Sequence, residues 1–204
     1  MSPIADQVPD NGFQGCYSLN TVAMANGIHA IGRGAFADCY NLTTVTIAAG
    51  VTTIGERAFE GCKKLTALTL PKGVESIGGW ACSCCESLET VAIHSSIKFI
   101  GESAFYDCKK MKKLSFPEKA EGLSIGENAF SYCQRITTLT LPEGVTSLGR
   151  CAVWHPMEMR ISTHPSEYIP LEAPVLLAPL ALSLARSLSL LKMLLRCVQP
   201  ISDA

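Results

Sequence analysis

A period of about 23 residues runs through the first three quarters of the chain and constrains its fold more than any single motif. One alanine returns at steps of 23, 23, 23, 25 and 23 residues: Ala35, Ala58, Ala81, Ala104, Ala129 and Ala152. An isoleucine or leucine precedes each alanine, and a cysteine follows all but the last in the same register. A fixed period in this range is typical of a solenoid, whose units bury their apolar faces only by stacking on their neighbours.

The composition excludes one large class of partner. The chain has 204 residues, of which 48% are hydrophobic, and a formal net charge of -1 from 17 Lys and Arg against 18 Asp and Glu. A chain of this length can bury a sizeable core, so one elongated domain with a tail is expected. Because the sequence contains no long basic run, it offers no electrostatic footprint for nucleic acid.

One repeat, residues 50–72, shows how the pattern predicts local structure. Leu65, Leu68 and Leu70 follow an L-x-x-L-x-L pattern, in which Leu68 and Leu70 alternate inward along a half-exposed strand that Pro71 ends. A second short extended piece is expected before Gly55, which supplies a tight turn. The stretch of residues 56–64 is too short for an independent helix, so one helical or 3₁₀ turn is expected there.

These residues resemble the BspA-like leucine-rich repeat family, whose units read as an Ile-Gly, Ala-Phe, Cys, Leu, Leu, Pro series. One unit matches at Ile54-Gly55, Ala58-Phe59, Cys62, Leu65, Leu68, Leu70 and Pro71. A second matches at Ile125-Gly126, Ala129-Phe130, Cys133, Ile136, Leu139, Leu141 and Pro142. The resemblance covers residues 13–153. It implies a leucine-rich-repeat stack of β-strands and the binding of proteins or glycans at the surface of bacteria and protists, with no shared active site and no cofactor.

Four segments are predicted. Residues 1–12 form an N-terminal extension, because the Ile-Gly half that should precede Phe13 is missing, and residues 13–153 form a solenoid of about six repeats, the first one partial. Residues 154–173 form a proline-containing linker and residues 174–204 a leucine-rich C-terminal helix. No signal peptide is visible, which predicts a cytoplasmic protein as the chain stands and a cell-surface protein if it is a fragment.

The leucine-rich tail has one strongly apolar face. Five leucines recur at spacings of three and four residues: Leu180, Leu184, Leu188, Leu191 and Leu195. Three cations in this stretch make a membrane-spanning helix marginal. The helix is expected to cap the C-terminal end of the solenoid. The alternatives are contact of the leucine face with a membrane or partner, and a tail that does not fold with the repeats.

The cysteines are interpreted as core residues. Stacked coils place six of them in one column, where small buried thiols fill a corner of each coil, although the spacing of about 4.8 Å would not forbid disulfide bridges. Cys82, Cys84 and Cys85 point in divergent directions, which is poor geometry for zinc, and Cys151, His155 and His164 match no catalytic or metal motif. No metal is therefore expected. Cys82 also stands in a phenylalanine register, where Trp80 is expected to compensate for the lost core volume.

The exposed strand positions form the candidate binding face. Ten residues alternate with the inward leucines and valines: Thr44, Thr46, Ala67, Thr69, Thr90, Ala92, Lys113, Ser115, Thr138 and Thr140. Threonine also favours exposed strand positions because it is β-branched, so the pattern alone does not demand a ligand. Glu56, Glu102 and Glu127 form a separate row that is interpreted as a solvated face.

The sequence thus favours a non-catalytic repeat scaffold that binds a protein or glycan ligand on its threonine-rich face. A membrane-associated surface or adhesion fragment is the alternative. Recognition of an ordered surface such as ice or mineral is a weaker one, because Ala67, Ala92 and Lys113 interrupt the hydroxyl array. An enzyme would need convergent acid, base or nucleophilic groups, and the repeated registers spread such groups evenly along the stack.

Overall fold

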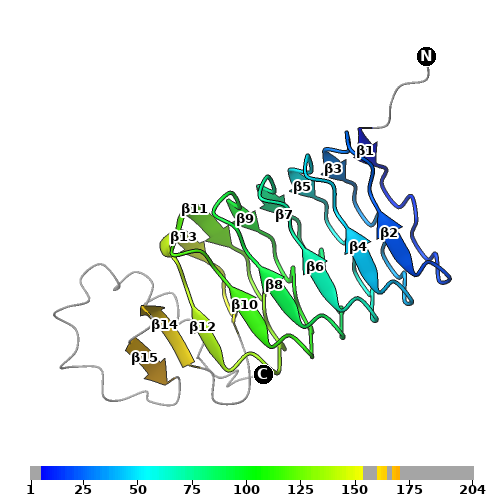
Figure 1. Cartoon of the computed structure of the whole chain (residues 1–204). Helices are drawn as coiled ribbons and strands as arrows, with labels where there is room; N and C mark the ends of the chain where they lie inside the picture. The colour runs from blue at the N-terminus through cyan, green and yellow to red at the C-terminus, as the bar shows by residue number, and fades with distance from the viewer. Residues whose placement is uncertain (1–5, 154–159, 165–166, 171–204) are drawn as a thin grey trace.

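The computed structural model describes residues 6–153, 160–164 and 167–170. The chain winds into a parallel β-solenoid of about six turns, and each turn contributes one short strand to each of two sheets (Figure 1). The predicted stack of leucine-rich coils is confirmed. The predicted C-terminal helix of residues 174–204 lies outside the described residues.

The first sheet is built from the Ile-Gly segments. Its seven strands are parallel and follow chain order: β1 (Gln7–Val8), β3 (Ala30–Ile31), β5 (Thr53–Ile54), β7 (Ser76–Ile77), β9 (Phe99–Ile100), β11 (Lys119–Ile125) and β13 (Glu143–Leu148). Within each short strand the isoleucine or its equivalent is buried and the residue before it is more exposed, as the period of two along a strand requires.

The second sheet is built from the Leu-x-x-Leu-x-Leu segments. It contains five parallel strands: β2 (Thr21–Ala23), β4 (Thr44–Thr46), β6 (Ala67–Thr69), β8 (Thr90–Ala92) and β10 (Lys113–Ser115). The corresponding strand of the next coil leaves this sheet and forms a third one: β12 (Thr138–Thr140), β14 (Arg160–His164) and β15 (Glu167–Pro170). The second sheet therefore ends at β10, although the stacking of coils continues.

The core is a set of columns, one for each register of the repeat. The alanines, cysteines and leucines of the repeating registers, such as Ala58, Cys62 and Leu65, are fully buried, as are the rings of Phe59 and Phe105. Phe36 stacks on Phe59 with the ring centroids 5.4 Å apart and the planes 3° from parallel. Offset stacked rings add to the stability gained from buried area. Hydrophobic burial is thus shared between neighbouring coils, as expected of a solenoid.

The segment between the two sheets is a chain of turns rather than the expected helical turn. Arg57 and Gly61 have positive φ angles of 57° and 70°, which break any helix. The backbone N–H groups alternate: Glu60 donates to Arg57 O at 3.1 Å within its coil, whereas Phe59 donates to Ala81 O at 2.7 Å in the next coil. Every second donor therefore joins two coils, which a helix would not allow.

The solenoid begins earlier than the predicted boundary at residue 13. Val8 lies in β1 opposite Ile31, so Val8 and Pro9 occupy the Ile-Gly register that the sequence pattern marks as missing. Val8 is buried, and Gly32 N donates to Val8 O at 2.8 Å. Residues from 6 onwards, assigned by the pattern to an N-terminal extension, therefore belong to the first coil.

The predicted linker of residues 154–173 contains two strands. β14 pairs with β12 in parallel, with Leu139 opposite Ile161, and β15 turns back antiparallel to β14. Strand pairing satisfies the backbone groups along the edge of β12, so this segment extends the last coil rather than only connecting it to the tail.

The repeat with the 25-residue step accommodates its two extra residues in a strand. β11 runs for seven residues beside β13, with register shifts on both sides of Leu123. Gly122 has a φ of 79° at this irregularity, while Ala120 and Leu123 are buried. A bulged strand therefore absorbs the insertion. The described part of the chain contains no helix with the length and hydrophobicity needed to span a bilayer.

Candidate binding face

The second sheet presents the predicted binding residues on its outer surface. Thr44, Thr46, Ala67, Thr69, Thr90, Ala92 and Lys113 are exposed, while Ser115 and Thr140 are half-buried. Thr138 lies in β12, where its backbone is paired with Arg160 of β14. Eight of the ten residues thus lie on four strands of one sheet, β4, β6, β8 and β10, and the other two lie on β12, the next strand of the stack (Figure 1).

The face extends further than the sequence pattern assigned. β2 pairs in register with β4, so that Thr21 lies opposite Thr44 and Ala23 opposite Thr46, and both β2 residues are exposed. The same alternation with Val22 could have identified them. With β2 included, the array spans five hydrogen-bonded strands, whose spacing in a parallel sheet is about 4.8 Å.

A shallow hollow interrupts the exposed array of small side chains between β10, the last strand of the second sheet, and β12, which belongs to the third sheet. It has a volume of about 270 Å³ and is lined by Lys112, Lys113, Leu114, Ser115, Phe116 and Thr140. Lys112 is paired with Glu89 at 3.3 Å, and the Phe116 ring lies edge-on to Phe130 with centroids 6.2 Å apart. Lys113, the hydroxyl groups of Ser115 and Thr140, and the Phe116 ring therefore line the hollow, at the place where the described strands of the second sheet end.

A ladder of side chains follows the register after the cysteines. Tyr17 stacks on Tyr40 with centroids 5.2 Å apart, and Lys63 Nζ lies 5.6 Å from the centre of the Tyr40 ring. Glu86 continues the ladder, 3.9 Å from Lys63 and 3.4 Å from Lys109. The carboxylate of Asp38 raises the pKa of Tyr40. Each exposed group in this ladder contacts the next coil, so the ladder joins coils across the surface.

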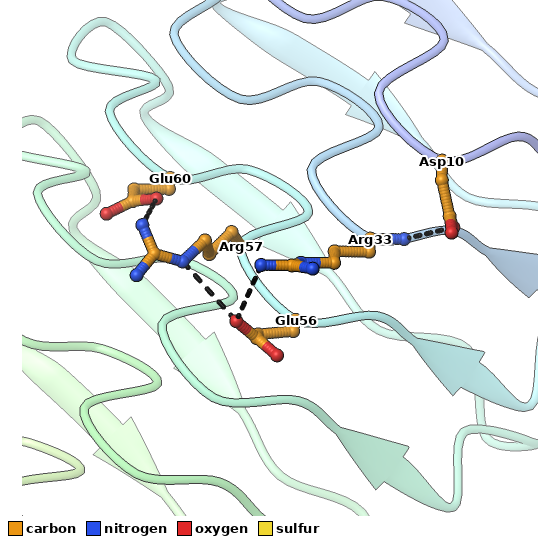
Figure 2. A network of polar contacts seen from close by, with 5 residues as sticks. All are labelled: Asp10, Arg33, Glu56, Arg57 and Glu60. Carbon is orange, nitrogen blue, oxygen red and sulfur yellow. Dashed lines mark hydrogen bonds and ion pairs between the residues drawn. The ribbon is translucent and has the colours of Figure 1, made fainter.

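A second polar network lies beside the Ile-Gly register (Figure 2). Asp10 accepts a hydrogen bond from Arg33 N at 2.7 Å, while Glu56 is 3.7 Å from Arg33 and 3.4 Å from Arg57. Arg57 also pairs with Glu60 at 3.2 Å. Glu56 is therefore engaged with two cations, although the pattern predicts a solvated row. The charges compensate one another, which leaves no strong single-sign potential here for a ligand.

Trp80 does not refill the core at the position of Cys82. It is half-buried and has a positive φ of 53°, and the Arg57 guanidinium lies 5.3 Å from the centre of its ring. A cation over an indole face is a favourable contact at the surface. Cys82 is fully buried, so the phenylalanine column is interrupted there between Phe59 and Phe105. The expected exchange of core volume between Cys82 and Trp80 is wrong.

The cysteine column has a structural bonding role that the pattern did not suggest. Each thiol donates to the carbonyl at the phenylalanine register of the preceding coil, as from Cys62 to Phe36 O at 3.2 Å and from Cys85 to Phe59 O at 3.1 Å. Cys39, Cys108 and Cys133 repeat this contact. The nine cysteines of the described residues are free. Burial raises the pKa of the Cys62 and Cys108 thiols, which favours the protonated donor.

Within the described residues, neither of the two cysteine-containing groups considered for metal binding forms a set of three potential ligands. Cys85 points into the thiol column, whereas Cys84 is half-buried, with its sulfur 3.7 Å from Ser83 Oγ. Cys151 O accepts a hydrogen bond from Ser131 Oγ at 2.6 Å, and His164 belongs to β14, while His155 is outside the described residues. In residues 6–153, 160–164 and 167–170, no group of three His, Cys, Asp or Glu side chains is arranged to hold a metal ion.

Comparison with known proteins places this repeat in a family. The model of the BspA type leucine-rich repeat region matches six copies over residues 4–112 and 29–160. The chain belongs to this family. The match concerns a repeat scaffold and names no catalytic activity. No curated protein sequence matches the chain.

This chain is similar in fold to solved structures of bacterial leucine-rich repeat proteins. The leucine-rich repeat protein of T. pallidum is 30% identical, with a TM-score of 0.67 over 73% of this chain and 69% of that one. A leucine-rich cell surface protein of Faecalibacterium prausnitzii is 32% identical, with a TM-score of 0.53 over 54% of this chain and 29% of that one. A protein of Bacteroides ovatus is 26% identical, with a TM-score of 0.55 over 72% of this chain and 44% of that one.

Proposed function

We propose that this BspA-type chain is a non-catalytic scaffold that binds a protein or glycan ligand on the outer face of its second sheet. The observation that carries the proposal is the exposed array of small side chains on β2, β4, β6, β8 and β10, which leads into the hollow at Lys113, Ser115 and Thr140. Such an array lets a ligand approach the sheet closely along its whole length.

The chemistry of the face favours a polar ligand. The hydroxyls of Thr46, Thr69 and Thr90 can donate and accept hydrogen bonds, and the Lys113 ammonium can donate to oxygen-rich groups. Tryptophan, tyrosine and arginine, which dominate the hot spots of protein interfaces, are not among the residues of this face. Oligosaccharides present many hydroxyl groups over an extended length, so a glycan fits the array better than an apolar protein surface does.

The likeness to a leucine-rich cell surface protein of Faecalibacterium prausnitzii supports an exposed binding role. That relative is 32% identical, but the match covers 29% of its length, so its setting is carried over here as part of the proposal. The alternative in which the leucine-rich tail mediates membrane association concerns residues 174–204, which lie outside the described part of the chain.

A matched pair of variants tests the face. Thr69→Arg places a long side chain at the centre of the second sheet, and Thr53→Arg places the same side chain at an exposed position of the first sheet. Both proteins and the wild type are applied to a printed array of mucin-type oligosaccharides and to a panel of extracellular-matrix proteins. We expect a bound ligand that Thr69→Arg weakens at least tenfold and Thr53→Arg leaves unchanged. Equal binding by the two variants would contradict the proposal.

A further inference from the structure

The coil that carries β10 concentrates positive charge beside the second sheet. Residues 109–119 contain five lysines and one glutamate, in a chain whose formal net charge is -1. Two of these lysines are neutralised by neighbours: Lys109 lies 3.4 Å from Glu86, and Lys112 lies 3.3 Å from Glu89. Within the described residues, no carboxylate forms an ion pair with Lys113. Lys113 is therefore a cation that the surrounding coils leave available to a ligand.

Lys113 stands in a register that carries small side chains in the preceding coils. The register pairs Thr44 with Ala67, Ala67 with Thr90, and Thr90 with Lys113. Lys113 is exposed and the next residue, Leu114, is buried, so the alternation along β10 turns the lysine to the outer face of the sheet. The neutral array on β4, β6 and β8 thus ends at one positive charge on β10.

The hollow next to Lys113 has room for one small chemical unit. Its volume is about 270 Å³, and the residues named above as its lining belong to two successive coils, those of β10 and β12. Pockets for whole drug-sized ligands measure about 300–1,000 Å³, so this hollow suits a single sugar residue of a longer chain. Ser115, Phe116 and Thr140 are half-buried at its surface, which holds them in place beside the exposed lysine.

The chemistry of the lining selects an acidic sugar. A lysine ammonium is a compact charge with three donors, and it pairs with a carboxylate or a sulfate without demanding one planar geometry. The hydroxyl groups of Ser115 and Thr140 can donate to and accept from sugar hydroxyls. The Phe116 ring offers an apolar contact for the C–H groups of a sugar. An ion pair at a partly enclosed site also favours one register of the ligand over others.

We propose that the hollow at Lys113 is the subsite for an anionic sugar residue, which carries a carboxylate or a sulfate, of a glycan whose neutral residues extend over β8 and β6. This inference rests on the proposed function, because it names the class of glycan that the second sheet binds. The anionic group pairs with the Lys113 ammonium, and the following residues bond the threonine hydroxyls. A single cation at the β10 end therefore fixes where the glycan lies along the stack.

Three fluorescently labelled hexasaccharides test the charge requirement. Hyaluronan carries carboxylates and no sulfate, keratan sulfate carries sulfates and no carboxylate, and carboxyl-reduced hyaluronan carries neither. Fluorescence anisotropy against the full chain, at constant ionic strength, gives each dissociation constant. We expect at least one anionic hexasaccharide to bind saturably and at least tenfold more tightly than the carboxyl-reduced one. The tighter of the two identifies the anionic group. Equal affinities for all three, or binding of none, would overturn the proposal.

Variants of the protein locate the anionic group. Lys113→Gln should weaken the anionic hexasaccharide at least tenfold and leave the carboxyl-reduced one unchanged, whereas Lys113→Arg keeps the charge and should retain binding. Thr140→Val removes one hydroxyl group and should weaken binding by a smaller factor, about threefold. Lys72→Gln is the matched control, because Lys72 is exposed and does not line the hollow. If Lys72→Gln weakens binding as much as Lys113→Gln does, the attraction is general and the subsite is overturned.

Thr69→Arg separates this inference from the proposed function on which it rests. We expect Thr69→Arg and Lys113→Gln each to weaken the anionic hexasaccharide. A neutral ligand that Thr69→Arg weakens and Lys113→Gln does not would keep the binding face and overturn the acidic subsite. An anionic hexasaccharide that Lys113→Gln weakens and Thr69→Arg leaves unchanged would confirm the subsite and contradict binding along the whole sheet.

Discussion

The two ends of the solenoid are finished in different ways. At the C-terminal end, β14 pairs with the backbone of β12 and β15 turns the sheet back, so the last coil gains irregular strands. At the N-terminal end no strand in the described residues covers β1 or β2, and Pro9 stands where a stacked coil needs glycine. One end is covered by added chain and the other is closed sterically at one sheet only. An outer coil of a repeat stack can thus be covered by added strands or carry a residue that a regular stacked coil does not tolerate.

Substitution at the glycine register should give the largest difference in unfolding free energy between an interior coil and the first coil. Gly55→Ala would place a Cβ atom 2.7 Å from backbone of the second coil, which cannot move without separating two coils. We expect a loss of at least ~2 kcal/mol in unfolding free energy, measured by urea denaturation. Pro9→Ala at the same register should change it by less than about 1 kcal/mol. A similar loss in both variants would show that the first coil is as tightly constrained as the interior.

Two truncations compare what covers the C-terminal end. Deletion of residues 154–204 removes β14 and β15 and should abolish the slow hydrogen exchange of the last coil around Leu139 and Leu148. Deletion of residues 174–204 alone should leave that protection in place, because the strand pairs remain. The first coil should be unaffected in both proteins. Loss of protection in the shorter deletion would assign the capping role to the leucine-rich tail, as the sequence predicts.

Substitution in the cysteine column should give a smaller difference in unfolding free energy between an interior coil and the first coil. Cys62→Ser buries a hydroxyl group in place of a thiol that bonds Phe36 O, and should cost about 1–3 kcal/mol. Cys16→Ser, at the half-buried start of the column, should cost less than about 0.5 kcal/mol. Urea denaturation of both variants gives the two values. Because the thiols bind no metal in this interpretation, EDTA should leave both midpoints unchanged, and chelator-induced unfolding would contradict it.

Alkaline pH should weaken the interior of the stack. Burial raises the pKa of the Cys62 thiol above 9, its ordinary value, so above about pH 9 the unfolded chain releases a proton that the folded chain retains. The stabilisation is fully present below this pH and is lost as the pH rises, by about 1.4 kcal/mol per pH unit for each such thiol. Denaturation between pH 8 and 10.5 measures the slope. Cys62→Ala should reduce this slope, and an unchanged slope in that variant would contradict the assignment.

The ladder of Lys63, Glu86 and Lys109 on the surface should contribute least to the unfolding free energy. Lys63, Glu86 and Lys109 are all more than a third exposed, and exposed ion pairs contribute about 0–1 kcal/mol. We expect Glu86→Gln to lower the unfolding free energy by less than about 0.5 kcal/mol, and the effect to vanish at 1 M salt. A loss of more than about 1 kcal/mol that persists at high salt would show that the ladder does more than join coils weakly.

The buried positions of the interior coils could be predicted from sequence because each register of the repeat mostly carries side chains of one size. A small alanine, a cysteine and a large phenylalanine return at fixed offsets, and Ala58, Cys62 and Phe59 are each fully buried. The first coil could not be predicted in this way, because Val8-Pro9 does not resemble Ile-Gly. Glycine is needed where another coil lies against this register, and within the described residues no strand pairs with the outer edge of β1 at Pro9.

The candidate face was predictable only in part. Alternation with inward residues such as Leu68 and Val91 gave the exposure of Thr69 and Ala92 correctly. The hollow at Lys113 and Thr140 was not foreseen, because it depends on β12 leaving the second sheet for β14, a pairing between segments that the repeat pattern does not include. The repeat pattern predicts the packing of a coil against a similar coil. It does not predict the packing of a coil against a segment of different sequence, such as β14 against β12.

The 23-residue step also gives the molecule a mechanical property. The thiol and backbone hydrogen bonds that hold one coil reach only the coils on either side of it, so a pulling force applied along the stack can detach a terminal coil without disturbing the rest. A released coil of 23 residues extends to about 80 Å, whereas it contributes about 4.8 Å to the folded length. Each coil of the solenoid therefore becomes about seventeen times longer when it detaches, and the coils detach one at a time.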